Sequence, residues 1–189
     1  MARVDAERNR ERILEIATRA FTTGDGSAPV PLEAIARDAG VGIGTLYRHF
    51  PTRDALVQAV HATELAALLA KADELLARHE PDRALRLWMD DYAAFVAGKR
   101  GMAESLRALT QSGAVSPMDT RARVTSTIGQ LLDAGIRAGT LRDDVRAEDV
   151  AASLVGTFLS LDRSAPTAER DAQATRMLDL LFDGIRVRG

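Results

Sequence analysis

The chain has 189 residues, of which 46% are hydrophobic and only 4% aromatic, and its 25 basic and 27 acidic residues nearly cancel. This length suits one mid-sized domain or two small ones, and the lack of cysteine excludes disulfides, thiolate catalysis and cysteine-bound metals. The three histidines stand too far apart to form a ligand pair at helical spacing, so we expect neither a metal site nor a cofactor. No apolar run approaches the length of a membrane span or a signal core, which predicts a soluble, cytoplasmic protein without a membrane partner.

Alanine and leucine dominate the hydrophobic residues, and both favour helices over strands. Apolar residues recur at helical spacing along most of the chain, which predicts an all-α fold of about nine helices. A break rich in glycine and proline separates the first two, at residues 23–31. Thr52 is a suitable N-cap for the long fourth helix, and Asp54 suits its first turn. In chain order, the expected segments are 6–23, 32–39, 43–49, 52–78, 82–97, 101–110, 118–138, 146–162 and 167–186.

Residues 40–50 read GVGIGTLYRHF and carry three glycines at alternate positions, which raises two interpretations. A dinucleotide-binding loop needs the spacing G-x-G-x-x-G directly after a buried strand, whereas here the spacing is G-x-G-x-G after a helical segment. A helix-turn-helix needs a small residue where its helices cross and a glycine in its turn, and Ala36 and Gly40 supply them. Val41 can fill the corner, while Leu46 and Phe50 lie four residues apart on the inward face of the second helix. We therefore favour the helix-turn-helix.

The charge around this motif is positive although the chain as a whole is slightly acidic. No acidic residue lies between Asp38 and Asp54, whereas residues 1–60 together hold eight basic and eight acidic residues. Nucleic-acid binding depends on where charges lie rather than on their total. The first helix also carries arginines that either reach DNA as an N-terminal arm or stay solvated beside acidic neighbours: Arg3, Arg8, Arg10 and Arg12.

The segment AIARDAGVGIGTLYRHFPTRDAL resembles the DNA-binding signature of the tetracycline-repressor (TetR) family of bacterial transcriptional regulators. It fits the pattern I-A-x-x-A-G-V-x-x-G-T-[LI]-Y-x-[HY]-F-x-[ST]-[KR]-x-x-L at nearly every fixed position. The resemblance covers about residues 8–60. It implies a DNA-binding head at residues 1–53 and a larger domain at residues 54–189 that binds an effector and dimerises.

The resemblance implies that Tyr47, His49 and Arg53 contact phosphate and that Thr45 contacts the DNA backbone or a base. It places Ile43, Gly44 and Arg48 at variable positions that face bases. Arginine can pair with guanine in the major groove, and isoleucine can touch a thymine methyl group. Tyr47 has a second interpretation as a core aromatic, and Arg48 has one as a solvated surface charge. Many family members carry serine or threonine where Gly42 stands, so we expect a recognition helix that frays until DNA orders it. The implied DNA contacts are Ile43, Gly44, Thr45, Tyr47, Arg48, His49 and Arg53.

The larger domain is expected to hold an effector cavity and a dimer interface. The helix at 82–97 concentrates the aromatic residues outside the head, which form either a packed core or the wall of a pocket. The candidate cavity residues are Trp88, Met89, Tyr92, Met102, Met118 and Phe158. The last two helices carry apolar stripes, which the family resemblance assigns to a four-helix dimer interface and which could also bury inside the chain. The candidate interface residues are Val150, Leu154, Gly156, Leu161, Met177, Leu178, Leu181, Phe182 and Ile185.

We therefore expect a homodimeric transcriptional repressor that leaves a palindromic DNA operator when a small-molecule effector binds. Two alternatives stay open, a ligand-responsive activator and a helical interaction module without specific DNA binding. An enzyme or a nucleotide-binding protein fits less well, because the sequence offers no acid–base pair, metal cluster or nucleophile arrangement.

Overall fold

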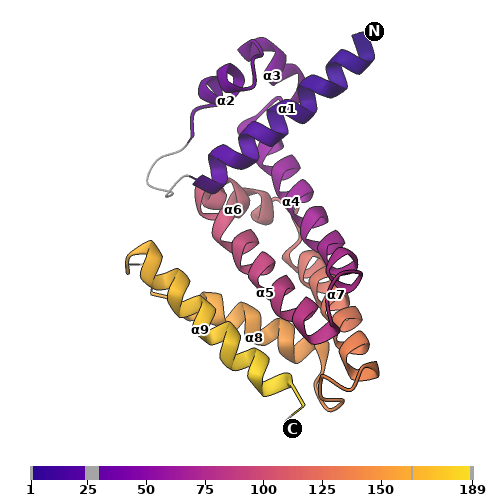
Figure 1. Ribbon diagram of the computed structural model, residues 1–189. Coiled ribbons are helices and arrows are strands. Elements are labelled where there is room, and N and C mark those ends of the chain that lie inside the picture. The colour runs from indigo at the N-terminus through magenta and orange to yellow at the C-terminus, as the bar shows by residue number, and fades with distance from the viewer. Residues whose placement is uncertain (1, 24–29, 163, 188–189) are drawn as a thin grey trace. The chain divides into compact units, whose positions relative to one another are not determined.

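The computed structural model describes residues 2–23, 30–162 and 164–187, and these residues are almost entirely helical (Figure 1). The all-α prediction is confirmed, because nine α-helices, one 3-10 turn (η1) and one isolated bridge between Leu141 and Arg186 make up the regular structure in these ranges. None of the described helices is long and apolar enough to cross a membrane. The elements are α1 (Ala2–Thr23), α2 (Leu32–Asp38), α3 (Ile43–His49), α4 (Arg53–Leu76), α5 (Pro81–Gly98), η1 (Arg100–Met102), α6 (Ala103–Gln111), α7 (Pro117–Arg137), α8 (Ala147–Ser160) and α9 (Thr167–Ile185).

Each predicted helix is present, with ends that differ from the expected ones by a few residues. The predicted break at residues 23–31 lies mostly outside the described residues, which resume at Val30. The chain forms two compact units, and each is described here by itself. The first contains Met1–Ala66 with Phe95–Pro117, and the second contains Ala67–Ala94 with Met118–Gly189.

The first unit joins the helix-turn-helix to a segment that lies far away in the sequence. Its core is built from the apolar stripe of α1, where Ile13, Ala17 and Phe21 are fully buried, and from the inward faces of α2, α3 and α4. Met102 and Leu109, from η1 and α6, pack in the same core. The end of α5, η1 and α6 therefore belong to the body that presents the helix-turn-helix.

Two glycines allow this segment to approach α1 closely. A Cβ atom at Gly101 would overlap the backbone carbonyl of Phe21, and one at Gly98 would lie 2.8 Å from the Cγ2 atom of Thr22. The backbone of α1 cannot yield as a flexible side chain would, so Gly101 has no tolerated replacement without a shift of one of the two segments.

The second unit is a helical assembly in which α8 and α9 lie side by side (Figure 1). Leu131, Leu154 and Leu178, one from each of α7, α8 and α9, are nearly or fully buried. The guanidinium of Arg86 on α5 donates hydrogen bonds to Asp90, at 2.6 Å, and to Asp179 on α9, at 3.0 and 2.6 Å. These bonds to two carboxylates hold α5 and α9 in register, since charge-assisted pairs of this kind are directional.

Candidate nucleic-acid interface

The turn between α2 and α3 has the geometry that the sequence predicts for it. Gly40 adopts φ = +68°, in the left-handed region that glycine enters without penalty. Its N–H donates to the Arg37 carbonyl at 3.0 Å, and the N–H of Val41 donates to the Ala36 carbonyl at 2.9 Å. This pair of bonds is a Schellman motif, which ends α2 and directs the chain into the next helix. Ala36, 2% exposed, provides the close crossing.

Helix α3 has one buried anchor and a projecting outer face. Leu46 is fully buried and Phe50, at the C-cap, is 3% exposed, so the inward positions are those predicted. Ile43 and Tyr47, one turn apart, are 38% and 44% exposed. Gly44 and Arg48 are also exposed, whereas Thr45 and His49 are half-buried. The structure therefore places Ile43, Gly44, Tyr47 and Arg48 on one accessible face, and Tyr47 is not a core aromatic.

The start of α3 lacks a side-chain cap. Gly42 is its N-cap, with φ −69° and ψ 148°, and no side chain bonds to the first turn. The Gly42 carbonyl accepts from the N–H groups of Thr45, at 2.9 Å, and Leu46, at 3.2 Å. Cβ atoms added at Gly42 and Gly44 would meet no atom within 4 Å. Packing against the described residues thus explains neither glycine.

Helix α4 begins with the predicted cap, because the N–H of Ala55 donates to the Thr52 hydroxyl at 3.0 Å. The first α4 residue, Arg53, lies differently from the expected phosphate contact. Its Nη1 donates to the Val30 carbonyl at 2.6 Å, and its guanidinium lies 5.3 Å from the ring centroid of Phe21. Arg53 therefore ties α4 to α1 and to the segment before α2, and its contact with phosphate stays a prediction.

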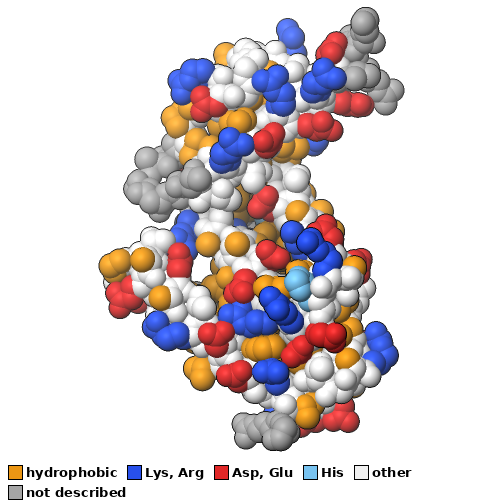
Figure 2. All heavy atoms as spheres, viewed as in Figure 1, with side chains coloured by type: hydrophobic (Ala, Val, Ile, Leu, Met, Phe, Trp, Pro, Cys, Tyr) orange, Lys and Arg blue, Asp and Glu red, His pale blue; other side chains and the backbone are white. Residues whose placement is uncertain are grey.

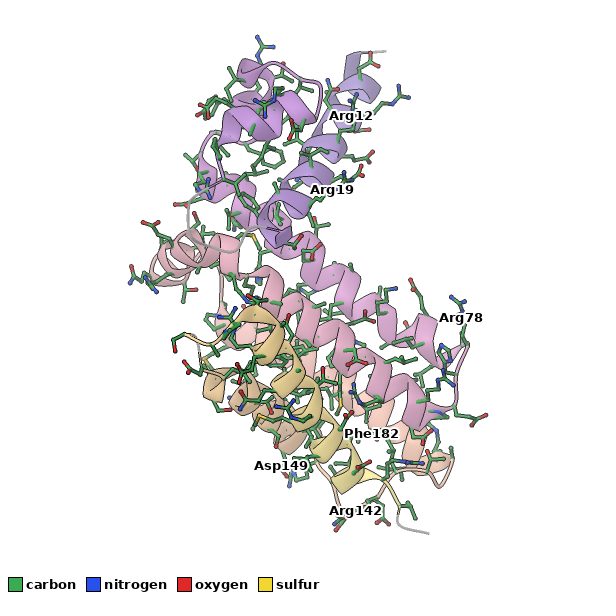
Figure 3. All side chains as sticks on the ribbon, turned by 60° about the vertical axis from the view of Figure 1, so that its left-hand side comes forward. Arg12, Arg19, Arg78, Arg142, Asp149 and Phe182 are labelled. Carbon is green, nitrogen blue, oxygen red and sulfur yellow. The ribbon has the colours of Figure 1, made fainter. Side chains whose placement is uncertain are left out.

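Two α1 arginines pack against the helix-turn-helix, which sequence reasoning missed. The Arg10 guanidinium lies 5.4 Å from the Phe50 ring centroid. Arg12, labelled in Figure 3, lies next to the turn, since a Cβ at Gly40 would be 2.8 Å from its Nη2. The side chain of Arg3, the outermost member of the predicted arm, lies outside the described residues. Only the folded arrangement brings Arg12 beside Gly40 and Arg10 beside Phe50, because they lie 28 and 40 positions apart in the sequence.

Positive charge is concentrated at α3 and is not spread over the whole surface. Basic and acidic side chains are mixed over the face shown in Figure 2, in keeping with the nearly balanced composition. Within α3 the two basic side chains, Arg48 and His49, lie in the last turn, where the helix dipole favours positive charge, and no acidic residue lies in the first turn. The three exposed side chains suit different parts of DNA. Arg48 can pair with guanine, Tyr47 can contact a phosphate, and Ile43 can contact a thymine methyl group.

Both parts of the chain match family models. Residues 13–60 match the model described as "Bacterial regulatory proteins, tetR family", and residues 80–187 match "Transcriptional regulator SbtR-like, C-terminal domain". The second match covers more than half of the chain. The chain belongs to the TetR family.

Solved structures of TetR regulators align with nearly the whole chain. A TetR transcriptional regulator from Streptomyces coelicolor, SCO0520, is 42% identical, with 95% of this chain and 99% of that one covered and a TM-score of 0.80. A TetR regulatory protein from Mycobacterium vanbaalenii is 37% identical, with 99% and 100% covered and a TM-score of 0.73. An HTH-type transcriptional regulator from Staphylococcus aureus is 32% identical over 77 residues, which span 41% of this chain and only 40% of that relative.

In this TetR-family chain, the second unit brings three of the predicted effector contacts together. Trp88 stacks on Tyr92 with ring centroids 5.9 Å apart, and Tyr92 lies 5.8 Å from Phe158. Trp88 and Met89 are fully buried, and the Trp88 N–H donates to the Leu68 carbonyl at 2.9 Å. Burial raises the pKa of Tyr92, and the charge of Arg121 opposes this shift. Trp88 is thus satisfied within the chain and needs no ligand to pair its N–H.

The two remaining effector candidates do not join this aromatic row. Met102 lies in the core of the first unit, and Met118 is 81% exposed at the start of α7. One surface hollow of about 440 Å³ lies instead at the turn between α4 and α5. Its lining is mostly polar and contains none of the predicted effector contacts: Leu76, Ala77, Arg78, His79, Glu80 and Arg83.

The predicted dimer residues separate into a buried and an accessible set. Four are buried inside the chain, which assigns them to the core of the second unit: Val150, Leu154, Leu178 and Ile185. Leu161, Met177, Leu181 and Phe182 are half-buried, and Gly156 is exposed. Sequence reasoning missed Leu159 on α8 and Leu180 on α9, which are 81% and 73% exposed. The helical period could have identified both, since each lies outside the buried stripe of its helix.

Proposed function

We propose that this chain is a sequence-specific, DNA-binding transcriptional repressor that works as a homodimer and leaves its operator when a small molecule binds. The observation that carries the proposal is α3, which is fixed to the head by Leu46 and presents Ile43, Tyr47 and Arg48 outward. A cytoplasmic location accords with this function, because a bacterial operator lies in the cytoplasm.

In the proposed complex, α3 lies in the major groove. Arg48 pairs with a base edge, Ile43 contacts a thymine methyl group, and the Tyr47 hydroxyl donates to a phosphate. The half-buried Thr45 and His49 flank these contacts on the backbone side. Gly44 leaves the outer surface of the first turn bare, which permits close approach of the helix to the bases.

The proposed dimer forms through the outer faces of α8 and α9. Leu159 and Leu180 are exposed, and so are Gly156 and Gly184, where an added Cβ would meet nothing within 4 Å. Small residues beside exposed leucines suit close packing of helices from a second copy. An isologous interface of this kind gives a two-fold axis, which matches a palindromic operator with two half-sites.

The proposed effector acts by shifting the population between DNA-competent and DNA-incompetent arrangements of the two heads. The packing of η1 and α6 into the head core supports a route for this coupling. A displacement of the end of α5 would be transmitted through Met102 and Gly101 to α1.

Selection from a random duplex DNA pool tests the proposal. The wild-type chain should enrich a palindromic sequence. Arg48→Ala should bind that sequence about 10–100-fold more weakly, because a base-reading arginine contributes about 1–3 kcal/mol. Arg146→Ala is the matched control, since Arg146 is an exposed arginine outside the head. If Arg48→Ala and Tyr47→Ala both bind as tightly as the control at moderate salt, the assignment of α3 to the groove is wrong.

A further inference from the structure

His61 on α4 is a buried polar side chain with an unsatisfied nitrogen. It is 7% exposed, and its Nδ1 atom has no hydrogen-bond partner within the described part of the chain. The imidazole stacks on the ring of Phe95, with centroids 5.8 Å apart and 26° between the planes. Most buried side-chain nitrogens have a partner, so packing alone does not account for a histidine at this position.

The ammonium group of Lys99 lies over the same aromatic ring. Its Nζ atom is 4.0 Å from the Phe95 ring centroid. Burial lowers the pKa of Lys99 to about 8, and no described carboxylate acts to raise it. Half-buried ammonium groups are normally paired with an anion, so the cation–π contact leaves this charge only partly compensated.

The electrostatics of the cluster disfavour positive charge. Burial, and then the charge of Lys99, lower the pKa of His61 to about 4. His61 and Lys99 both contact the Phe95 ring. A negative group that reached both side chains would accept hydrogen bonds from both and would stabilise the ammonium form of Lys99. His61, Phe95 and Lys99 all belong to the first unit, so this arrangement lies within one compact body.

We propose that His61 and Lys99 bind the carboxylate of a small organic acid whose apolar part packs against Phe95. The Nδ1–H of His61 donates to one carboxylate oxygen, and the ammonium of Lys99 donates to the other. A carboxylate fits better than a phosphate, because one neutral imidazole and one ammonium would leave the additional oxygens and charge of a phosphate unsatisfied.

This inference rests on the proposed effector response, and it assigns that response a ligand class and residues outside the aromatic row of Trp88. Lys99 is followed directly by η1, whose Gly101 and Met102 pack on α1 and in the head core. A carboxylate drawn to Lys99 would therefore act on the segment that supports the helix-turn-helix.

Lysine-selective ¹³C NMR of the full chain provides a direct test, since Lys71 and Lys99 are its only lysines. Octanoate is the probe, and 1-octanol is its uncharged counterpart. Octanoate should shift the Lys99 signals saturably and raise the Lys99 pKa toward its ordinary 10.5. Lys71, which is exposed and pairs with Glu74 at 3.6 Å, should not respond. The inference is overturned if Lys99 does not respond, or if octanol and octanoate shift its signals alike.

Calorimetry on variants gives a second, independent readout. Lys99→Met should weaken octanoate binding by about tenfold or more, since a charge-assisted hydrogen bond is lost, while Lys71→Met should bind like the wild type. His61→Phe should also weaken binding, and His61→Gln, which keeps a donor, should restore part of it. Equal octanoate affinity in Lys99→Met and the wild type would overturn the inference. Selection of a DNA sequence by the ligand-free wild type tests the proposed function separately, so the two can fail independently.

Discussion

Acidification should destabilise the protein through His61, which is buried in its neutral form. Burial and the nearby charge of Lys99 lower its pKa from the ordinary 6.5 to about 4. The unfolded chain therefore takes up a proton more readily than the folded chain, so the contribution of His61 to stability is complete above pH 6.5 and is lost as the pH falls toward 4. These two pKa values give a loss in the free energy of unfolding of about 2 kcal/mol between pH 7.5 and pH 5.

Urea unfolding followed by helical circular dichroism at these two pH values measures the loss. His61→Phe is the informative variant, because phenylalanine keeps an aromatic ring to stack on Phe95 and does not titrate. Its acid-induced loss should be smaller than that of the wild type by about 2 kcal/mol. His79→Asn, at the turn between α4 and α5, should retain the full loss because His61 remains. If the wild type and His61→Phe lose the same stability on acidification, the reasoning from the buried imidazole is refuted.

Three further predictions follow from the head and from the outer face of α8 and α9. Gly44→Ala should stabilise the head by about 0.5–1 kcal/mol in thermal unfolding, because alanine loses less backbone entropy in a helix and its Cβ meets no atom within 4 Å. The added methyl group should also weaken operator binding. If stability and operator binding both stay unchanged, the first turn of α3 does not face the DNA as proposed. Arg53→Met should lower the free energy of unfolding by about 1–2 kcal/mol and leave the salt dependence of DNA binding unchanged; a slope reduced by about one would restore Arg53 as a phosphate contact. Leu180→Asp should produce monomers in sedimentation equilibrium at micromolar concentration, since Leu180 is 73% exposed and unpacked within the chain, and a persistent dimer would place the interface elsewhere.

Local chemistry explains why the helix-turn-helix could be predicted from the sequence. The left-handed Gly40, the small Ala36 and the Thr52 cap each depend on neighbours within a few residues. The inward position of Leu46 follows from helical spacing alone. Such contacts form between residues that are close in the sequence, so residue types and their spacing are sufficient to predict them.

The contacts that the sequence did not predict are made by side chains whose partners lie far away in the sequence. Arg53 fits the family pattern for a phosphate contact, yet it binds the Val30 carbonyl, which no spacing rule links to it. Met102 is an effector candidate by residue type, because methionine adapts to pockets, yet it packs in the head core. An apolar stripe likewise does not reveal whether it packs within its own chain or against a second copy, and Val150 and Leu154 are buried within the chain.

The segments that make up the first unit determine how effector binding could influence the DNA-binding surface. A head that ended at residue 53 would be linked to the rest of the chain through α4 alone. The described head core also includes Met102 and Leu109, and the Gly101 backbone lies so close to the Phe21 carbonyl that a side chain there would overlap it. Rigid, close-packed contacts transmit displacement rather than absorb it. A ligand that moves the end of α5 by a small amount would therefore shift α1 as well as α4, and with α1 the arginines that flank α3. This gives the His61–Lys99 cluster a position from which one carboxylate could change DNA binding.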